Sequence, residues 1–214
     1  MRVFVGFDPR EAVAYHACVQ SIIETARDPL ALQFTPVTGP LRDGSNAFIY
    51  ARFLVPHLCG FSGFAVFLDG DMVVRAPIED LFAQQRWGVG ALVVKHDYLT
   101  KHPVKYLGNK NEDYPRKNWS SVILWNCGYF PNRILTPEYV AQQPGSHLHR
   151  FGWLKDEQIG ALPDEWNRLV LEQDVMDADK ILHYTIGTPC FSEYATCDRA
   201  DEWHAVHKRM NAPC

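Results

Sequence analysis

The sequence lacks three features that would each define a class of protein. No stretch approaches the ~20 apolar residues of a membrane span, and the apolar run at the N-terminus is too short for a secretory signal. There is no basic excess to gather nucleic acid, since the formal net charge is -4. The six cysteines include no Cys-x-x-Cys pair, which favours reduced thiols over a disulfide framework. We therefore expect a cytoplasmic protein with no membrane span and no nucleic-acid partner.

What the sequence does contain is enough apolar material for one substantial core. Of the 214 residues, 47% are hydrophobic and 13% are aromatic, which favours a single domain over residues 1–214. Short runs rich in branched and aromatic residues alternate with segments of helical spacing. This order predicts an α/β fold with helices on both faces of a mainly parallel sheet.

The alternation assigns elements along the chain. Strands are expected at residues 2–7, 30–37, 64–70, 72–74, 89–94 and 180–187, and a pair of strands with a break near Asn126 at 120–130. Helices are expected at residues 8–26, 45–58, 78–85, 154–163 and 199–210. Residues 95–117 carry charges, His, Tyr and Pro without periodicity, so we expect a long surface loop there.

Two acids stand at the end of one apolar strand, in the stretch FAVFLDGDMVV. Asp69 and Asp71 are two residues apart, so in extended chain their side chains face the same way and can converge on one point. In open α/β sheets the ligand crevice lies beyond the carboxyl ends of the strands, where this pair falls. Converging carboxylates repel unless a cation or a shared proton lies between them, and oxygen ligands suit Mg²⁺ or Mn²⁺. The pattern therefore indicates a divalent cation site.

The pattern is short, and taken alone it also fits a turn cap or a phosphatase. In the first case the acids merely cap a turn after a strand. In the second, a phosphatase of the haloacid dehalogenase type places this pattern after an apolar strand, with the first acid as nucleophile. Such enzymes usually carry a Thr where Val73 stands, and their motif lies near the start of the chain, whereas here it begins at Asp69. These departures disfavour the phosphatase.

Further stretches, in their order along the chain, resemble glycosyltransferase family 8. They are VFVGFD, YARFLVP, FLDGDMVV, WNCGYF, KDEQIGALPDEWN and HYTIGTPCF, and they extend from Arg2 to about Tyr194. The resemblance implies the GT-A fold, a nucleotide-sugar donor that is usually UDP-linked, and Mn²⁺ (or Mg²⁺) on its diphosphate. It also implies transfer to a glycan or other hydroxyl acceptor, with retention at the anomeric carbon. The alternative is a GT-A-like protein that binds a nucleotide sugar or a glycan without turnover.

The resemblance assigns the metal site to three residues. Asp69 and Asp71 match the metal-binding pair, and His183, in the stretch HYT, matches the third protein ligand. Two carboxylates and one imidazole form a sensible ligand set for Mn²⁺. A histidine in an apolar strand can also be a buried core residue with no ligand role, and that alternative stays open for His183.

Three further residues match positions that contact the donor. Asp8 corresponds to an acid that contacts the nucleotide base, although its place before Pro9 equally fits a helix N-cap. Arg52 corresponds to an arginine of the donor site, where its guanidinium could pair with phosphate or with the first acid of the pair. Asn126, in the stretch NCG, fits a side chain directed at the hydroxyls of the donor sugar.

Two departures from the family pattern concern the reaction itself. Family galactosyltransferases typically read Asp-Gln-Asp where this chain has Asp156, Glu157 and Gln158. We therefore expect Glu157 to face the anomeric carbon and Asp156 to bind sugar hydroxyls. After HYTIG the family often has a lysine for the donor phosphate, and the stretch TPC that stands here has none. The backbone of Gly187 and the metal are then expected to carry the phosphate contact.

The acceptor is expected to enter over the loop 95–117. Side chains that stack and hydrogen-bond suit sugar recognition, and this loop has several: His96, Asp97, Tyr98, His102 and Tyr106.

Overall fold

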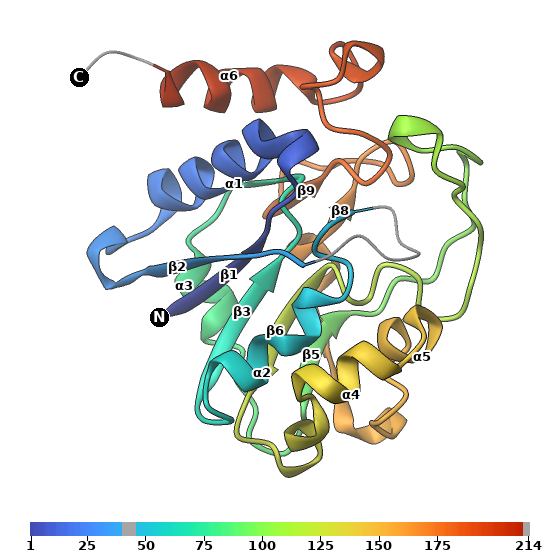
Figure 1. Cartoon of the computed structure of the whole chain (residues 1–214). Helices are drawn as coiled ribbons and strands as arrows, with labels where there is room; N and C mark the ends of the chain where they lie inside the picture. Colours follow the sequence, from blue (N-terminus) through green and yellow to red (C-terminus); the bar gives the residue numbers. More distant parts are fainter. Residues whose placement is uncertain (40–45, 212–214) are drawn as a thin grey trace.

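The computed structural model describes residues 1–39 and 46–211 (Figure 1). Its strands are β1 (Arg2–Gly6), β2 (Gln33–Val37), β3 (Phe64–Leu68), β4 (Met72–Val74), β5 (Ala91–Val94), β6 (Val122–Asn126), β7 (Ile159–Leu162), β8 (Arg168–Leu169) and β9 (Ile181–His183). Its α-helices are α1 (Ala12–Thr25), α2 (Val55–Leu58), α3 (Ile78–Phe82), α4 (Pro137–Gln142), α5 (Gly145–His149) and α6 (Ala200–Met210).

The larger sheet has six strands in the order β2-β1-β3-β6-β5-β7. β6 runs antiparallel to both of its neighbours, β3 and β5, and the other pairs of neighbouring strands are parallel. One core, with side chains from α1 and α3, packs on one face of this sheet, and a second core, with side chains from α2, α4 and α5, packs on the other. The expected α/β architecture, a mainly parallel sheet flanked by helices, is therefore confirmed.

β3 lies in the interior of this sheet, and its sequence reflects that position. All five of its residues are buried. Val66 and Leu68 pack in the core beside α1, whereas Ala65 and Phe67 pack in the core beside α2. A strand covered on both faces has no solvent side for polar residues. The continuous apolar run before Asp69 follows from this double burial.

A smaller sheet carries the remaining strands in the order β4-β9-β8. β4 and β9 are antiparallel, with Met72 opposite His183, and β8 runs parallel to β9. A third apolar cluster joins this sheet to α1 and α6 through residues such as Val73, Leu182 and Trp203. In Figure 1, α6 lies alongside α1 at the top of the molecule. The smaller sheet thus brings the residues after position 180 next to the end of β3.

Three expected elements differ from the structure. The helix expected at 154–163 is wrong: Asp156–Gln158 form a single 3₁₀ turn and the next residues form β7, which pairs with β5. The strand pair expected at 120–130 is wrong, since β6 ends at Asn126 and a turn follows it. The helix expected at 45–58 is reduced to a 3₁₀ turn and α2, and Ser45 lies outside the described residues. Short apolar runs such as IGAL fit a strand or a helix equally by periodicity.

No helix in the two described ranges is long and apolar enough to cross a bilayer. The five cysteines in those ranges are free thiols, and three of them are buried. Cys214 lies outside the described residues.

Gly70 separates the two acids and approaches the backbone of β1 closely. A Cβ built on Gly70 would overlap the carbonyl oxygen of Gly6. Gly70→Ala should therefore displace the turn and lower the free energy of unfolding by about 1–3 kcal/mol, the usual cost of overpacking. Denaturant unfolding measures this loss. Gly88→Ala is the control, because a Cβ there meets no atom within 4 Å, and equal losses in the two variants would contradict the steric cause.

Candidate active site

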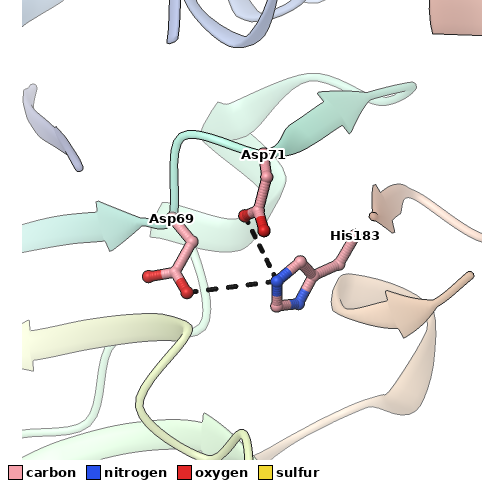
Figure 2. A group of neighbouring side chains, drawn as sticks. All are labelled: Asp69, Asp71 and His183. Carbon is pink, nitrogen blue, oxygen red and sulfur yellow. Dashed lines mark ion pairs between the residues drawn. The ribbon is translucent and has the colours of Figure 1, made fainter. Parts of the chain in front are cut away.

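Asp69 and Asp71 lie in the turn between β3 and β4 (Figure 2). The N–H of Asp69 donates to the carbonyl of Ser121 over 3.0 Å, and the carbonyl of Asp71 accepts from the N–H of Tyr184 over 2.9 Å. Each acid is only 8% exposed. The backbone of two neighbouring strands therefore fixes the turn, and the turn holds both carboxylates out of bulk water.

His183 ends β9 and faces the two acids. Its Nε2 lies 3.2 Å from Asp71 Oδ1 and 4.0 Å from Asp69 Oδ2. One ligand atom from each of the three residues lies within 4.8 Å of the other two. Figure 2 shows the three side chains pointing toward one another from β9 and from the turn after β3. The structure thus brings together the three residues that the sequence assigns to the metal site.

The ring of His183 is oriented by a buried amide. Its Nδ1 lies 3.0 Å from Oδ1 of Asn167, and Nδ2 of Asn167 donates to Ser121 Oγ over 2.8 Å. Since the amide nitrogen is used by Ser121, the amide oxygen accepts and His183 Nδ1 carries the proton. Nε2 therefore faces the carboxylates, where it shares a proton with Asp71 or gives its lone pair to a cation. Such outer partners orient histidine ligands in metal sites.

Arg52 is a buried cation beside the first acid. Its Nη1 lies 2.7 Å from Asp69 Oδ1 and donates to the carbonyl of Ser120 over 2.8 Å. The guanidinium also lies over the rings of Phe48 and Phe67, 5.2 and 5.1 Å from their centroids. Of the two partners that the sequence leaves open for Arg52, the structure shows the acid. Arg52 therefore neutralises and positions Asp69.

The surroundings shift the pKa values of Asp69 and Asp71 in opposite directions. Burial raises the pKa of Asp69 to about 6, against the opposing attraction of Arg52. Burial acts on Asp71 too, but the attraction of His183 and Lys105 outweighs it, and the pKa of Asp71 lies below its usual value. Oδ1 of each acid is buried, and it lies against Nη1 of Arg52 in Asp69 and against Nε2 of His183 in Asp71. Two buried carboxylates together with one imidazole nitrogen are a ligand set that fits a divalent cation such as Mn²⁺ or Mg²⁺.

The three residues open onto a cleft at the carboxyl end of β3. The cleft is also lined by the chain before α2, the loop 95–117, the residues just before β6, the end of α5 and Thr185. The lining side chains are Asn46, Ile49, Arg52, Lys105, Tyr106, Tyr114, Asn118, Ser120, Ser121, His149 and Thr185, beside Asp69, Asp71 and His183. The cleft is therefore lined mainly by polar groups around the candidate metal site.

The structure does not bring Asn126 to this cleft. β6 runs antiparallel to β3, so Asn126 pairs with Phe64 at the start of β3, whereas the acids follow its end. The amide of Asn126 instead donates to two backbone carbonyls at that far end. Ser120 and Ser121, which come just before β6, line the cleft in its place. The residues of β6 do not themselves indicate its direction, and this direction decides which end of the strand reaches the site.

Asp156 and Glu157 lie in an exposed 3₁₀ turn, and neither lines the cleft. Asp156 forms an ion pair with Arg116. Arg116 stands between Tyr114 and Asn118, which both line the cleft. The ion pair therefore places Asp156 near the rim of the cleft rather than inside it.

Asp8 and Gly187 lie near the cleft without lining it. Asp8 caps the turn after β1: its Oδ1 accepts from the N–H of Arg10, and its Oδ2 from the N–H of Ala47, each over 2.9 Å. The expected N-cap is thus confirmed. The N–H of Gly187 donates to the carbonyl of Tyr184 over 2.9 Å. The backbone amide that the sequence assigns to phosphate is therefore already hydrogen-bonded.

Several residues of the site could not be singled out from the sequence. Glu11 is buried and accepts from the hydroxyl of Tyr106 over 3.0 Å. Burial, and then the charge of Asp71, raise the pKa of Glu11 to about 8. Lys105 also faces the cleft, within a loop that the sequence assigns only to the acceptor. The loop has no periodicity that would single out Lys105, whereas knowledge of the direction of β6 would have indicated Ser120 and Ser121.

Comparison with solved structures identifies this architecture as the GT-A fold of glycosyltransferases. Galactosyltransferase LgtC, solved with donor and acceptor sugar analogues, matches with a TM-score of 0.66 and 12% identity over 100% of this chain and 98% of that chain. GlyE of Streptococcus pneumoniae TIGR4 matches with a TM-score of 0.63 and 13% identity, over 96% of this chain and 59% of its own. Identities this low show the fold alone.

Similarity in sequence is closer to a plant protein. The chain is 40% identical over 221 aligned positions to Protein CDI of Arabidopsis thaliana, an alignment that covers 94% of this chain and 84% of that protein. The chain belongs to the family of Protein CDI. No protein-family model matches the chain.

If Asp69, Asp71 and His183 bind a metal ion, that ion should stabilise the folded protein. Mn²⁺ should raise the melting temperature, because a ligand that binds only the folded state stabilises it. Asp71→Asn keeps the volume and removes one ligand charge, so this rise should be lost while the far-UV spectrum stays unchanged. A thermal-shift titration measures the loss. Asp177→Asn, at an exposed acid, should respond to Mn²⁺ as the parent does, and an undiminished response in Asp71→Asn would exclude the metal assignment.

Proposed function

We propose that the protein is a metal-dependent, retaining glycosyltransferase. It moves a sugar from a nucleotide-sugar donor, UDP-linked, to a glycan or other hydroxyl acceptor. The observation that carries this proposal is the cluster of Asp69, Asp71 and His183 at the carboxyl end of β3, in a chain with the GT-A fold. LgtC, which shares that fold, was crystallised with donor and acceptor sugar analogues.

The cluster would hold the cation through two carboxylates and one imidazole. A divalent cation there supplies positive charge to the diphosphate as it departs. The protein's part is positioning: Asn167 orients His183, and Arg52 holds Asp69. Burial of all five side chains excludes water and strengthens these interactions.

The nucleotide would lie along the ends of β1 and β3. These strands are parallel neighbours, with Val5 opposite Leu68, so Asp8 and Asp69 follow adjacent strand ends. Asp8 already accepts from the backbone and the guanidinium of Arg10 and from the N–H of Ala47, which is about as many hydrogen bonds as a carboxylate accepts. We keep Asp8 as the contact with the nucleotide base on the family resemblance, and a base bound there would replace part of the Arg10 contact.

The acceptor would enter through a second hollow that adjoins the cleft. The two share Ile49, Tyr114 and His149, and the hollow is also lined by Tyr50, Glu112, Pro144, Gly145, Ser146 and Arg150. Tyrosine rings suit stacking on sugars, and the polar side chains suit hydroxyl groups. Burial lowers the pKa of His149 to about 3, so its ring is neutral and can hydrogen-bond a hydroxyl. Of the loop residues expected to bind acceptor, Tyr106 reaches the cleft, whereas His96 is buried.

A second candidate function is supported by one observation. Asp156 and Glu157, the acids assigned to the reaction centre, are exposed and lie outside the cleft lining. A GT-A-like protein that binds a nucleotide sugar or a glycan without turnover would need no acid there. The two functions differ in one measurable property, which is the breakdown of donor.

A transferase should hydrolyse its donor slowly when acceptor is absent, because water replaces the acceptor hydroxyl. We expect UDP release from a panel of UDP-sugars in the presence of Mn²⁺, and no release in EDTA. Asp71→Asn should lower the rate by at least tenfold. A parent protein that is stabilised by UDP-sugar and Mn²⁺ yet releases no UDP would identify the binding protein instead.

Substitutions of Asp156 and Glu157 should have different effects on the kinetics. If the donor sugar extends from the cation to the rim, Glu157→Gln should lower kcat more than it raises the donor KM. Asp156→Asn should instead raise the donor KM, because contacts made equally in the ground and transition states appear in KM. Steady-state rates with the donor found above test both. A parental rate in Glu157→Gln would remove Glu157 from the reaction.

A further inference from the structure

Lys105 brings a positive charge from the loop 95–117 into the metal cleft. Its Nζ donates to Thr185 Oγ1 over 2.8 Å, and Thr185 lies two residues after His183. Lys105 lines the cleft together with Asp69 and Asp71, and its charge lowers the pKa of both acids. The ammonium is thus part of the electrostatics of the site.

The backbone holds Lys105 in this place. The N–H of Lys105 donates to the carbonyl of Asn109 over 2.8 Å, and the N–H of Tyr106 donates to the carbonyl of Ile186 over 2.7 Å. The hydroxyl of Tyr106 is bonded to the buried Glu11. The loop is therefore fixed both to the segment after β9 and to the residue before α1.

Among the described residues, the protein accepts only part of the hydrogen-bonding capacity of the Lys105 ammonium. An ammonium has three donors, and among the described residues Thr185 Oγ1 accepts one of them while no carboxylate oxygen lies within 4.0 Å. Arg52, the other cation lining the cleft, is already bound to Asp69 and to the carbonyl of Ser120. Burial lowers the pKa of Lys105 to about 8, so at neutral pH the charged form predominates. A cation with spare donors in a cleft is a site for an anionic ligand group.

The segment after His183 offers no competing phosphate ligand. The amide of Gly187 is bonded to Tyr184, and the following Thr188, Pro189 and Cys190 carry no positive charge. The hydroxyl of Thr188 lies 2.8 Å from the thiol of Cys190. The positive charge that this segment lacks in its own sequence is supplied by Lys105, which is hydrogen-bonded to Thr185.

We propose that Lys105 binds the phosphate groups of the donor diphosphate, on the side of the metal site that Thr185 marks. This assignment rests on the proposed function, since it takes the diphosphate of a nucleotide sugar as the ligand. Lys105 then neutralises the departing diphosphate, whereas Arg52 is paired with Asp69. The loop 95–117 consequently contributes to donor binding, in addition to any contact with acceptor.

Binding measurements on the full chain test this assignment without relying on turnover. The probes are UDP and inorganic pyrophosphate, each titrated with Mg²⁺ present, and Mn²⁺ alone. Lys105→Met should weaken the affinity for both phosphate probes at least tenfold. Mn²⁺ alone should bind as tightly as to the parent or more tightly, because a positive charge near the cation has been removed. Lys105→Arg keeps the charge and should recover most of the affinity.

The control is Lys110→Met, in the same loop, whose side chain is 86% exposed; it should bind all three probes as the parent does. Parental pyrophosphate and UDP affinity in Lys105→Met would overturn the assignment, even if the protein transfers sugar. If Lys105→Met loses Mn²⁺ binding as well, Lys105→Arg decides: recovered phosphate affinity supports the assignment and lost affinity contradicts it. A parent that binds pyrophosphate through Lys105 but turns over no donor would refute the proposed function and leave this assignment standing.

Discussion

The rest of the site depends on one electrostatic constraint, the burial of two carboxylates in a single turn. Asp69 and Asp71 follow a strand that is covered on both faces, and each is nearly inaccessible to water. Two buried negative charges this close oppose ionisation of each other unless positive charge is placed between or beside them. The surrounding structure supplies that charge from segments far apart in the sequence.

Two features of the topology bring those segments in. The antiparallel β6 begins beside the end of β3. Just before it, the carbonyl of Ser120 accepts from Arg52 and that of Ser121 accepts from the N–H of Asp69. The smaller sheet sets β9 against β4, so that His183 faces the acids. Asn167 links the two features, since it contacts both Ser121 and His183. One buried amide thereby couples the larger sheet to the candidate metal site.

The sequence predicts site residues that depend on alternation along one strand, and it does not predict contacts that depend on the direction of a strand. The pair Asp69 and Asp71 could be identified because alternation along one strand decides where both side chains point, and His183 followed from the family resemblance. Asn126 lies beside the start of β3, away from the cleft, and nothing local in its strand shows that β6 is antiparallel. Lys105 lies in a loop whose shape is set by backbone hydrogen bonds to Asn109 and Ile186, which no periodicity reveals.

In the proposed function, the charges of the cleft would also couple the binding of the metal to that of the diphosphate. Asp69 and Asp71 carry two negative charges, and Arg52 and Lys105 carry two positive ones, while Glu11, with its pKa raised to about 8, is mainly protonated at neutral pH. In a cleft so balanced, a divalent cation or a diphosphate bound singly leaves an uncompensated charge in a poorly solvated place, so each should bind more weakly alone than beside the other. Bound together, the two nearly cancel. Each should therefore raise the affinity for the other by the same factor, since such coupling is reciprocal.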